Sequence, residues 1–192
     1  MESNINSSSI LVLMSGGIDS TALIHYYLSK NYRVKCLHFQ YSQDSFKSEL
    51  EAVDRISEYY GVEVEIIKFG FPFKNNHGEY RSRNAIFILT AANLLASEFA
   101  KIGIGIHRGT PYYDCSEVFL NDCQKIIDGY FRGTLTIDAP FLQHTKEQVY
   151  RYCIENKIPT SLTFSCENSN DKPCGSCPSC EDRRLLNEVN SL

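Results

Sequence analysis

The segment ILVLMSGGIDSTALIHYYL, residues 10–28, decides which fold the sequence predicts. Residues 10–14 form a short apolar run that is typical of a buried strand, and the turn Ser-Gly-Gly follows at residues 15–17. Beyond the turn, apolar residues recur at the spacing of one helix face: Ala22, Leu23, Tyr26 and Tyr27. The segment therefore predicts a strand, a tight turn and a helix, the repeating unit of a parallel sheet with flanking helices.

The same alternation continues along the chain. Further strands are expected over residues 34–39, 62–69, 102–106 and 135–141. Helices are expected over residues 45–60, 84–100 and 118–130, and from Thr145, where Gln148 completes a capping box. About five strands that alternate with helices predict an α/β fold with a doubly wound, parallel, five-stranded sheet. The binding crevice of such a fold lies at the carboxyl ends of its strands.

Two of these helices carry apolar residues that predict their buried faces. The predicted faces consist of Phe46, Leu50, Val53 and Ile56 in the first helix, and of Val149, Tyr150, Cys153 and Ile154 in the second. The loop over residues 70–80 and the region after Pro159 are predicted to be irregular, until a final helix over residues 181–189.

The length and composition are those of an ordinary globular protein. The 192 residues are too few for two ordinary domains, so a single domain over residues 1–192 is expected. A net charge of −4 argues against a broad basic surface for nucleic acid, which leaves small molecules or proteins as partners. No apolar run approaches the roughly eighteen residues of a membrane span, and residues 1–9 lack a secretory signal pattern. We therefore expect a cytoplasmic protein without membrane contact.

The loop MSGGIDS, residues 14–20, has the character of an anion site. Gly16 and Gly17 let the backbone turn tightly and present bare N–H groups, Ser15 and Ser20 add hydroxyls, and a helix start follows. The loop is neither a Walker A loop nor a dinucleotide fingerprint, and it lacks the lysine that grips a transferred phosphate. It therefore predicts a cradle for a leaving pyrophosphate, beside which Asp19 can assist magnesium. The alternative is a purely structural turn in which serine caps the helix.

Four of the eight cysteines lie within SCENSNDKPCGSCPSCEDRR, residues 165–184, at the spacing C-x7-C-x2-C-x2-C. Four thiolates around one ion make a closed structural zinc site, so the spacing predicts that Cys166, Cys174, Cys177 and Cys180 bind zinc. Residues 160–184 would then be a zinc-binding C-terminal segment. An iron–sulfur cluster is the alternative, and a disulfide is disfavoured in a reducing compartment.

The other four cysteines fall into two groups. Cys36, Cys123 and Cys153 lie on apolar faces and are expected to be core residues. Cys115 follows Asp114 in a loop before a helix start, where a thiolate would be favoured, so a functional role is open for it.

Five motifs occur in an order that resembles the 7-cyano-7-deazaguanine synthase family, which makes the precursor preQ0 of queuosine. They are LMSGGIDSTALIHYYL (13–28), YRSRNAIF (80–87), YYDCSEVF (112–119), TKEQV (145–149) and the cysteine segment (165–184). The resemblance covers residues 10–184, and the loop alone is shared with the wider N-type ATP pyrophosphatases. It implies an adenine nucleotide alpha hydrolase-like fold.

The resemblance also implies an ATP-dependent carbon–nitrogen ligase. Members of the family adenylate the carboxylate of 7-carboxy-7-deazaguanine, release pyrophosphate and let ammonia form an amide, which a second ATP converts to the nitrile. The implied cofactors are ATP, Mg²⁺ and Zn²⁺, and family members often form homodimers. By position, the implied nucleotide-binding residues are Ser15, Gly16, Gly17, Ser20, Arg83 and Asn84. The implied catalytic residues are Asp19, Asp114, Cys115 and Lys146, and the four clustered cysteines would hold zinc.

The chain departs from the family's usual sequence at three places. Residues 41–45 are Tyr-Ser-Gln-Asp-Ser, where the family usually has Tyr-Gly-Gln-Arg-His. Arg81 replaces the usual proline before Gly-Arg-Asn. The usual Ser-Gly-Tyr-Pro-Asp-Cys-Arg is Thr-Pro-Tyr-Tyr-Asp-Cys-Ser at residues 110–116. These changes surround the substrate side and leave the phosphate loop and the cysteines intact, so activation should persist while the carboxylate or its acceptor can differ.

Three other functions stay open. A divergent paralog in bacterial antiviral defence would join the activated nucleobase to an amine on a protein. A tRNA thiolase would need a sulfur-carrying cysteine and a basic surface, which the acidic composition disfavours. A non-catalytic nucleotide-binding scaffold is the last, and the intact loop argues against it.

Overall fold

The computed structural model describes residues 8–73, 75–76, 79–95, 98–168 and 171–189. Five strands form one parallel sheet: β1 (Ser9–Leu13), β2 (Arg33–Gln40), β3 (Glu63–Lys68), β6 (Lys101–Gly103) and β7 (Thr136–Asp138). Their order across the sheet is β3-β2-β1-β6-β7, so β1 lies in the centre: β2 and β3 are added on one side of it, and β6 and β7 on the other. The predicted doubly wound sheet is confirmed.

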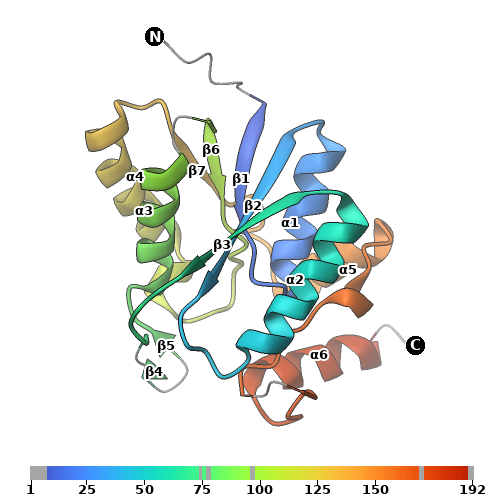
Figure 1. Cartoon of the computed structure of the whole chain (residues 1–192). Helices are drawn as coiled ribbons and strands as arrows, with labels where there is room; N and C mark the ends of the chain where they lie inside the picture. The colour runs from blue at the N-terminus through green and yellow to red at the C-terminus, as the bar shows by residue number, and fades with distance from the viewer. Residues whose placement is uncertain (1–7, 74, 77–78, 96–97, 169–170, 190–192) are drawn as a thin grey trace.

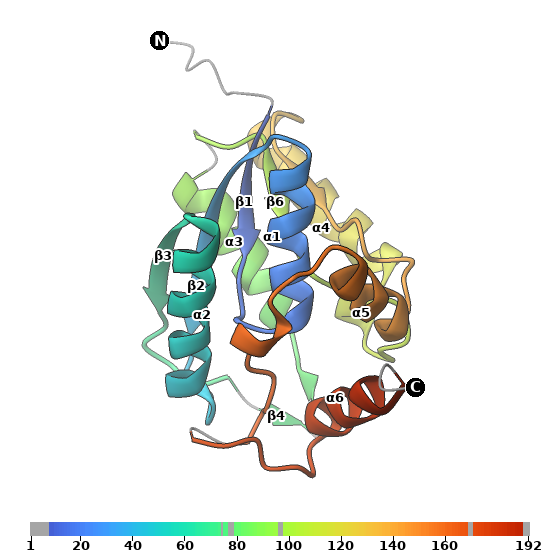
Figure 2. The same ribbon diagram turned by 90° about the vertical axis from the view of Figure 1, so that its right-hand side faces the viewer.

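Helices cover both faces of this sheet (Figures 1 and 2). The helices α1 (Ile18–Ser29), α2 (Phe46–Tyr60) and α5 (Lys146–Glu155) lie on one face, while α3 (Arg83–Leu95) and α4 (Glu117–Phe131) lie on the other. Neighbouring side chains of a strand point to opposite faces. Ile10 and Val12 of β1 accordingly pack toward α1, and Leu11 and Leu13 pack toward α3.

The last helix, α6 (Pro178–Val189), lies beyond the carboxyl ends of the strands, at the bottom of Figure 1. Leu186 attaches it to the core on the α1 side. The helix begins three residues earlier than the sequence predicts. A short 3₁₀ helix, Thr160–Leu162, also lies in the region that was expected to be irregular. Another 3₁₀ turn, Tyr113–Cys115, precedes α4.

Three strand and helix boundaries differ from the prediction. The apolar runs 102–106 and 135–141 pair in the sheet only over β6 and β7, because Ile104 and Ile106 continue into a buried loop. Helix α3 ends at Leu95, and the predicted loop 70–80 contains a small antiparallel pair, β4 (Asn75–Asn76) and β5 (Glu79–Tyr80).

Two predicted helix faces are partly wrong. Phe46 of α2 is 46% exposed, and the buried face consists of Ser48, Ala52, Val53 and Ile56. Ile154 of α5 is 47% exposed, although the other three predicted residues of that face are buried. Phe46 and Ile154 lie at helix ends, whereas Leu50, which is half-buried, lies within α2.

The capping box of α5 is confirmed. The Thr145 hydroxyl accepts from the Gln148 N–H, and the Gln148 side chain accepts from the Thr145 N–H. Cys36, Cys123 and Cys153 are buried as expected. Within the ranges described above, no helix combines the length and the apolar character needed to cross a membrane.

Candidate active site and metal centre

A cavity of about 810 Å³ opens at the carboxyl ends of the strands. Among the residues that line it are nine of the predicted site residues: Ser15, Gly17, Asp19, Ser20, Arg83, Asn84, Asp114, Cys115 and Lys146. Cys166 lines it as well, while Gly16 is buried and does not line the cavity. The fold thus brings together residues from the loop after β1, the start of α3, the turn before α4 and the start of α5. Their catalytic and binding roles stay predictions.

The phosphate loop owes its shape to Gly16. This residue has a φ of +82°, and a Cβ atom added to it would lie 2.9 Å from the Glu49 carbonyl oxygen. The Ser20 hydroxyl donates to the Gly17 carbonyl (3.1 Å), and the Ser15 hydroxyl accepts from the Gly17 N–H (3.3 Å). Gly17 is the N-cap of α1 and makes no side-chain cap, so the expected alternative of a serine-capped helix is wrong. The first N–H groups of α1 therefore face the cavity end without a cap, as an anion site requires.

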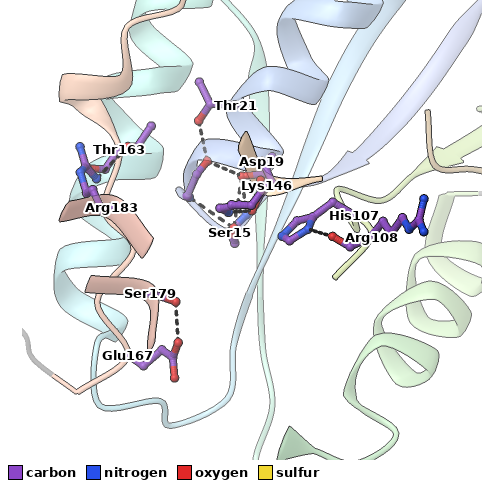
Figure 3. A network of polar contacts seen from close by, with 12 residues as sticks. Ser15, Asp19, Thr21, His107, Arg108, Lys146, Thr163, Glu167, Ser179 and Arg183 are labelled. Carbon is purple, nitrogen blue, oxygen red and sulfur yellow. Dashed lines mark hydrogen bonds and ion pairs between the residues drawn. The ribbon is translucent and has the colours of Figure 1, made fainter. Parts of the chain in front are cut away.

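Asp19 and Lys146 meet beside this loop from opposite ends of the chain (Figure 3). The Lys146 ammonium donates to Asp19 Oδ2 at 2.5 Å. Asp19 Oδ1 is buried and has no hydrogen-bond partner among the described residues. A buried carboxylate oxygen without a partner suits a hard cation, and Mg²⁺ prefers such oxygen ligands. Asp19 therefore fits a magnesium ion next to the loop.

The expected thiolate at Cys115 is wrong. Burial, together with the negative charge of Asp114, raises the pKa of Cys115 to about 12. Its thiol donates to Asp114 Oδ1 (3.8 Å), and the Asn84 side chain donates to the Asp114 carbonyl (3.5 Å). Burial and a neighbouring carboxylate favour the protonated thiol at neutral pH, and a catalytic role of Cys115 stays a prediction.

Arg83 lies between two aromatic rings that the sequence analysis did not assign to the site. Its guanidinium donates to the Tyr41 hydroxyl (3.1 Å) and lies 5.0 Å from the centre of the Tyr80 ring. Tyr41 lies two residues after the predicted strand 34–39 and directly after β2, and this position at the carboxyl end of a strand could have indicated that it belongs to the site. Tyr80 has no such signal, because a short hairpin brings it to the cavity.

The four clustered cysteines converge as predicted. Their sulfur atoms all lie within 4.8 Å of one another, and those of Cys174 and Cys180 are 4.0 Å apart. A tetrahedral ion with about 2.3 Å bonds to sulfur spaces its ligands by about 3.8 Å, so the four residues fit one metal ion. In the absence of an ion, hydrogen bonds from Ser176 lower the pKa of Cys174 to about 6, whereas burial raises that of Cys180 to about 12. The convergence of the four sulfur atoms, and not these pKa values, is what supports a metal ion.

The cysteine segment is joined to the phosphate loop. The Phe164 N–H donates to the Gly16 carbonyl oxygen (2.9 Å), two residues before Cys166. Arg183 of α6 donates to the Thr160 carbonyl (2.8 Å) and to the Thr163 carbonyl and hydroxyl (both 3.1 Å), as Figure 3 shows for Thr163. The sequence analysis gave neither Phe164 nor Arg183 a role. No local pattern predicts their contacts, which join Phe164 to Gly16 near the other end of the chain and Arg183 to residues that are 20 and 23 positions away.

A comparison with protein families identifies the group to which this architecture belongs. The model of the family described as queuosine biosynthesis protein QueC matches residues 9–79 and 80–188. The chain belongs to the QueC family. The predicted family resemblance is thereby confirmed over nearly the whole chain.

Curated relatives within the QueC family are named 7-cyano-7-deazaguanine synthase. The protein of that name from Persephonella marina is 30% identical, over 92% of this chain and 91% of the relative. The one from Nautilia profundicola is 28% identical, over 90% of each chain. Among solved structures, NMN synthetase from Francisella tularensis superposes with a TM-score of 0.59 at 13% identity, over 96% of this chain and 79% of the other. That likeness shows a common fold.

Proposed function

We propose that the chain is an ATP-dependent ligase that adenylates the carboxylate of a deazapurine such as 7-carboxy-7-deazaguanine. Pyrophosphate leaves, ammonia attacks the acyl-adenylate and displaces AMP to form an amide, and a second ATP activates the amide oxygen so that the amide loses water to give the nitrile. The single observation that carries this proposal is the cavity, in which an uncapped helix start, the Asp19–Lys146 pair and Arg83 converge. The names of the curated relatives, 7-cyano-7-deazaguanine synthase, support the choice of substrate.

The loop side of the cavity suits the departure of pyrophosphate. Backbone N–H groups at the start of α1 and the Ser15 hydroxyl can hold phosphate oxygens without moving, because Gly16 and Ser20 fix the loop. Lys146 adds a positive charge where negative charge develops on the leaving group. Asp19 orients Lys146 through their ion pair. A magnesium ion held by Asp19 would spread charge over the phosphate oxygens.

We assign zinc to the four cysteines. An iron–sulfur cluster interposes several atoms between its thiolates, whereas these sulfurs are close enough to touch a single ion. Bound zinc would supply structural stability and no open ligand position. Independently of the ion, hydrogen bonds of Phe164 and Arg183 hold residues 160–166 next to Gly16.

One group of observations favours a second candidate function, transfer of the activated nucleobase to an amine on a protein, as in a bacterial antiviral defence system. The departures from the family's sequence lie around the substrate side of the cavity. There Ser116 caps α4 by accepting from the Phe119 N–H (3.1 Å), where an arginine is usual. A helix cap thus stands at a position where the family resemblance implies a charged side chain.

The test is product formation by the purified full chain with ATP, Mg²⁺ and 7-carboxy-7-deazaguanine, with and without ammonia. The proposal expects AMP, pyrophosphate and an ammonia-dependent amide or nitrile in the mass spectrum. A mass added to a protein, without a small-molecule product, would instead favour the second candidate. Absence of AMP and pyrophosphate under every condition would refute both.

A further inference from the structure

Arg83 is a partly buried cation without a paired anion. The ion pairs among the described residues do not include it, and its one hydrogen-bond partner there is the Tyr41 hydroxyl (3.1 Å). Its Nε atom is buried and has no partner in that part of the chain. A guanidinium has five N–H donors, so most of its donor capacity is unused. Burying a charge without an opposite charge is unfavourable, and proteins keep such an arrangement mainly where a ligand completes it.

The carboxylates nearest to Arg83 are engaged elsewhere. Glu49 accepts from Gln43 Nε2 (2.8 Å) and from the Ser45 hydroxyl (2.5 Å), and Asp114 accepts from the Cys115 thiol. Burial opposes the charge of Arg83, yet Tyr41 and the more distant Asp114 and Glu49 leave its pKa raised. Arg83 therefore stays positively charged, while neither carboxylate forms a direct pair with it.

Tyr41 cannot supply the missing negative charge. Burial raises its pKa to about 12, so its hydroxyl is neutral at neutral pH. Its oxygen orients the guanidinium by accepting one N–H. The Tyr80 ring, 5.0 Å away, stabilises the cation through its face. The protein thus fixes the position of the Arg83 guanidinium but provides no negatively charged group that pairs with it.

The walls beside Arg83 are flat and aromatic. Phe39, Tyr41, Tyr80 and Phe87 all line the same cavity, and the rings of Phe39 and Phe87 stack with their centres 4.2 Å apart. Tyr41 and Tyr80 meet edge to face at 5.7 Å. Rigid aromatic walls with one fixed charged group favour a planar, aromatic, monoanionic ligand over a flexible or polyanionic one.

We infer that Arg83 binds the carboxylate of the acid that is activated, and that the Phe39, Tyr41, Tyr80 and Phe87 rings hold its flat ring system. Arg83 would then bind the acid and not the nucleotide, which is the role that the family resemblance implies for it. The nucleotide would be bound by the loop at the other side of the cavity. The identity of the ligand rests on the proposed function, so the probe is 7-carboxy-7-deazaguanine. Its neutral counterpart, 7-cyano-7-deazaguanine, has the same ring and lacks the charge.

The experiment measures equilibrium binding of both probes to the full chain by calorimetry, without ATP. Arg83→Met removes the charge, Arg83→Lys keeps it without the fork of donors, and Arg132→Met is the matched control at an exposed position. ATP binding is measured in parallel, as the check that each variant is folded. We expect Arg83→Met to bind the acid about 10 to 100 times more weakly, the range of a lost charged hydrogen bond, with nitrile binding nearly unchanged.

Three results would overturn the inference. These are an unchanged ratio of acid to nitrile affinity in Arg83→Met, equal weakening of both probes, or a wild type that binds neither. Should Arg83→Met fail to fold, Arg83→Lys still decides, because it should weaken the acid selectively. Since binding is measured without turnover, acid binding through Arg83 with no AMP formed refutes the proposed function alone. AMP formed by wild type and Arg83→Met at the same KM for the acid refutes this inference alone.

Discussion

The two sides of the cavity both contain residues with a left-handed backbone conformation, but the space around these residues differs. On the loop side, Gly16 (φ +82°) is packed so tightly that a Cβ would press into the Glu49 carbonyl. On the Arg83 side, Ser42 (φ +62°) and Ser82 (φ +63°) adopt the same region with side chains, at positions where the family resemblance implies glycine. Such a conformation costs a residue other than glycine about 1–2 kcal/mol. The loop side has no room for a side chain at Gly16, while the Arg83 side accommodates two serine side chains in strained backbone.

The largest effect expected from this comparison is on the loop side. Asp19→Ala should lower the rate of pyrophosphate release by at least about 100-fold, because it frees Lys146 and removes the oxygen that fits magnesium. The melting temperature should change by only a few degrees. The measurement is pyrophosphate release with the exposed Asp44→Ala as control, and an active Asp19→Ala protein would contradict the proposed role of the pair.

The next effect concerns the segment that closes the loop side. Cys177→Ser should release the metal and lower the free energy of unfolding by at least about 2 kcal/mol, since metal binding contributes folding free energy. ATP binding should also weaken, because residues 160–166 would no longer hold Gly16. Metal content, melting curves and ATP affinity test this. Cys123→Ser, at a buried cysteine outside the cluster, controls for the loss of a thiol. Full metal occupancy with an unchanged melting curve would refute the metal site.

A smaller effect tests the packing of Gly16 itself. Gly16→Ala should destabilise the protein by about 1–3 kcal/mol, from the left-handed φ and the contact with the Glu49 carbonyl. Denaturant unfolding measures it, with Gly61→Ala as the control. Gly61 also has a positive φ (+63°), but its added Cβ would meet nothing within 4 Å. Equal losses in both variants would mean that backbone strain, and not packing, requires the glycine at position 16.

The smallest effect has the opposite sign and lies on the Arg83 side. Ser42→Gly and Ser82→Gly should each stabilise the protein by about 0.5–1 kcal/mol, because the left-handed strain is relieved. Ser57→Gly, within helix α2, should destabilise it by about 0.5 kcal/mol. If the two variants at positive φ lose stability instead, the serine side chains contribute contacts that outweigh the strain.

Much of the loop side could be predicted from the sequence, because its signals are local. Gly16, Gly17 and the cysteine spacing act over a few residues, and the parallel order of strands follows from the alternation of apolar runs. The pairing of Asp19 with Lys146 crosses 127 positions, and only the family resemblance brought both to one site. The Arg83 side was less accessible to prediction. The environment of Cys115 depends on burial that no sequence pattern shows, and Tyr80 reaches the cavity through a hairpin in a predicted loop.

The central claim is that the loop and Arg83 bring an ATP phosphate and a carboxylate together within one cavity. It is tested most directly with 7-carboxy-7-deazaguanine that carries ¹⁸O in its carboxylate, incubated with ATP, Mg²⁺, ammonia and the purified chain. Adenylation joins a carboxylate oxygen to the α-phosphate, and departure of AMP leaves that oxygen on the nucleotide. The account predicts AMP that contains one ¹⁸O atom. AMP free of the label would contradict it, because ATP would then be cleaved without passing through the carboxylate.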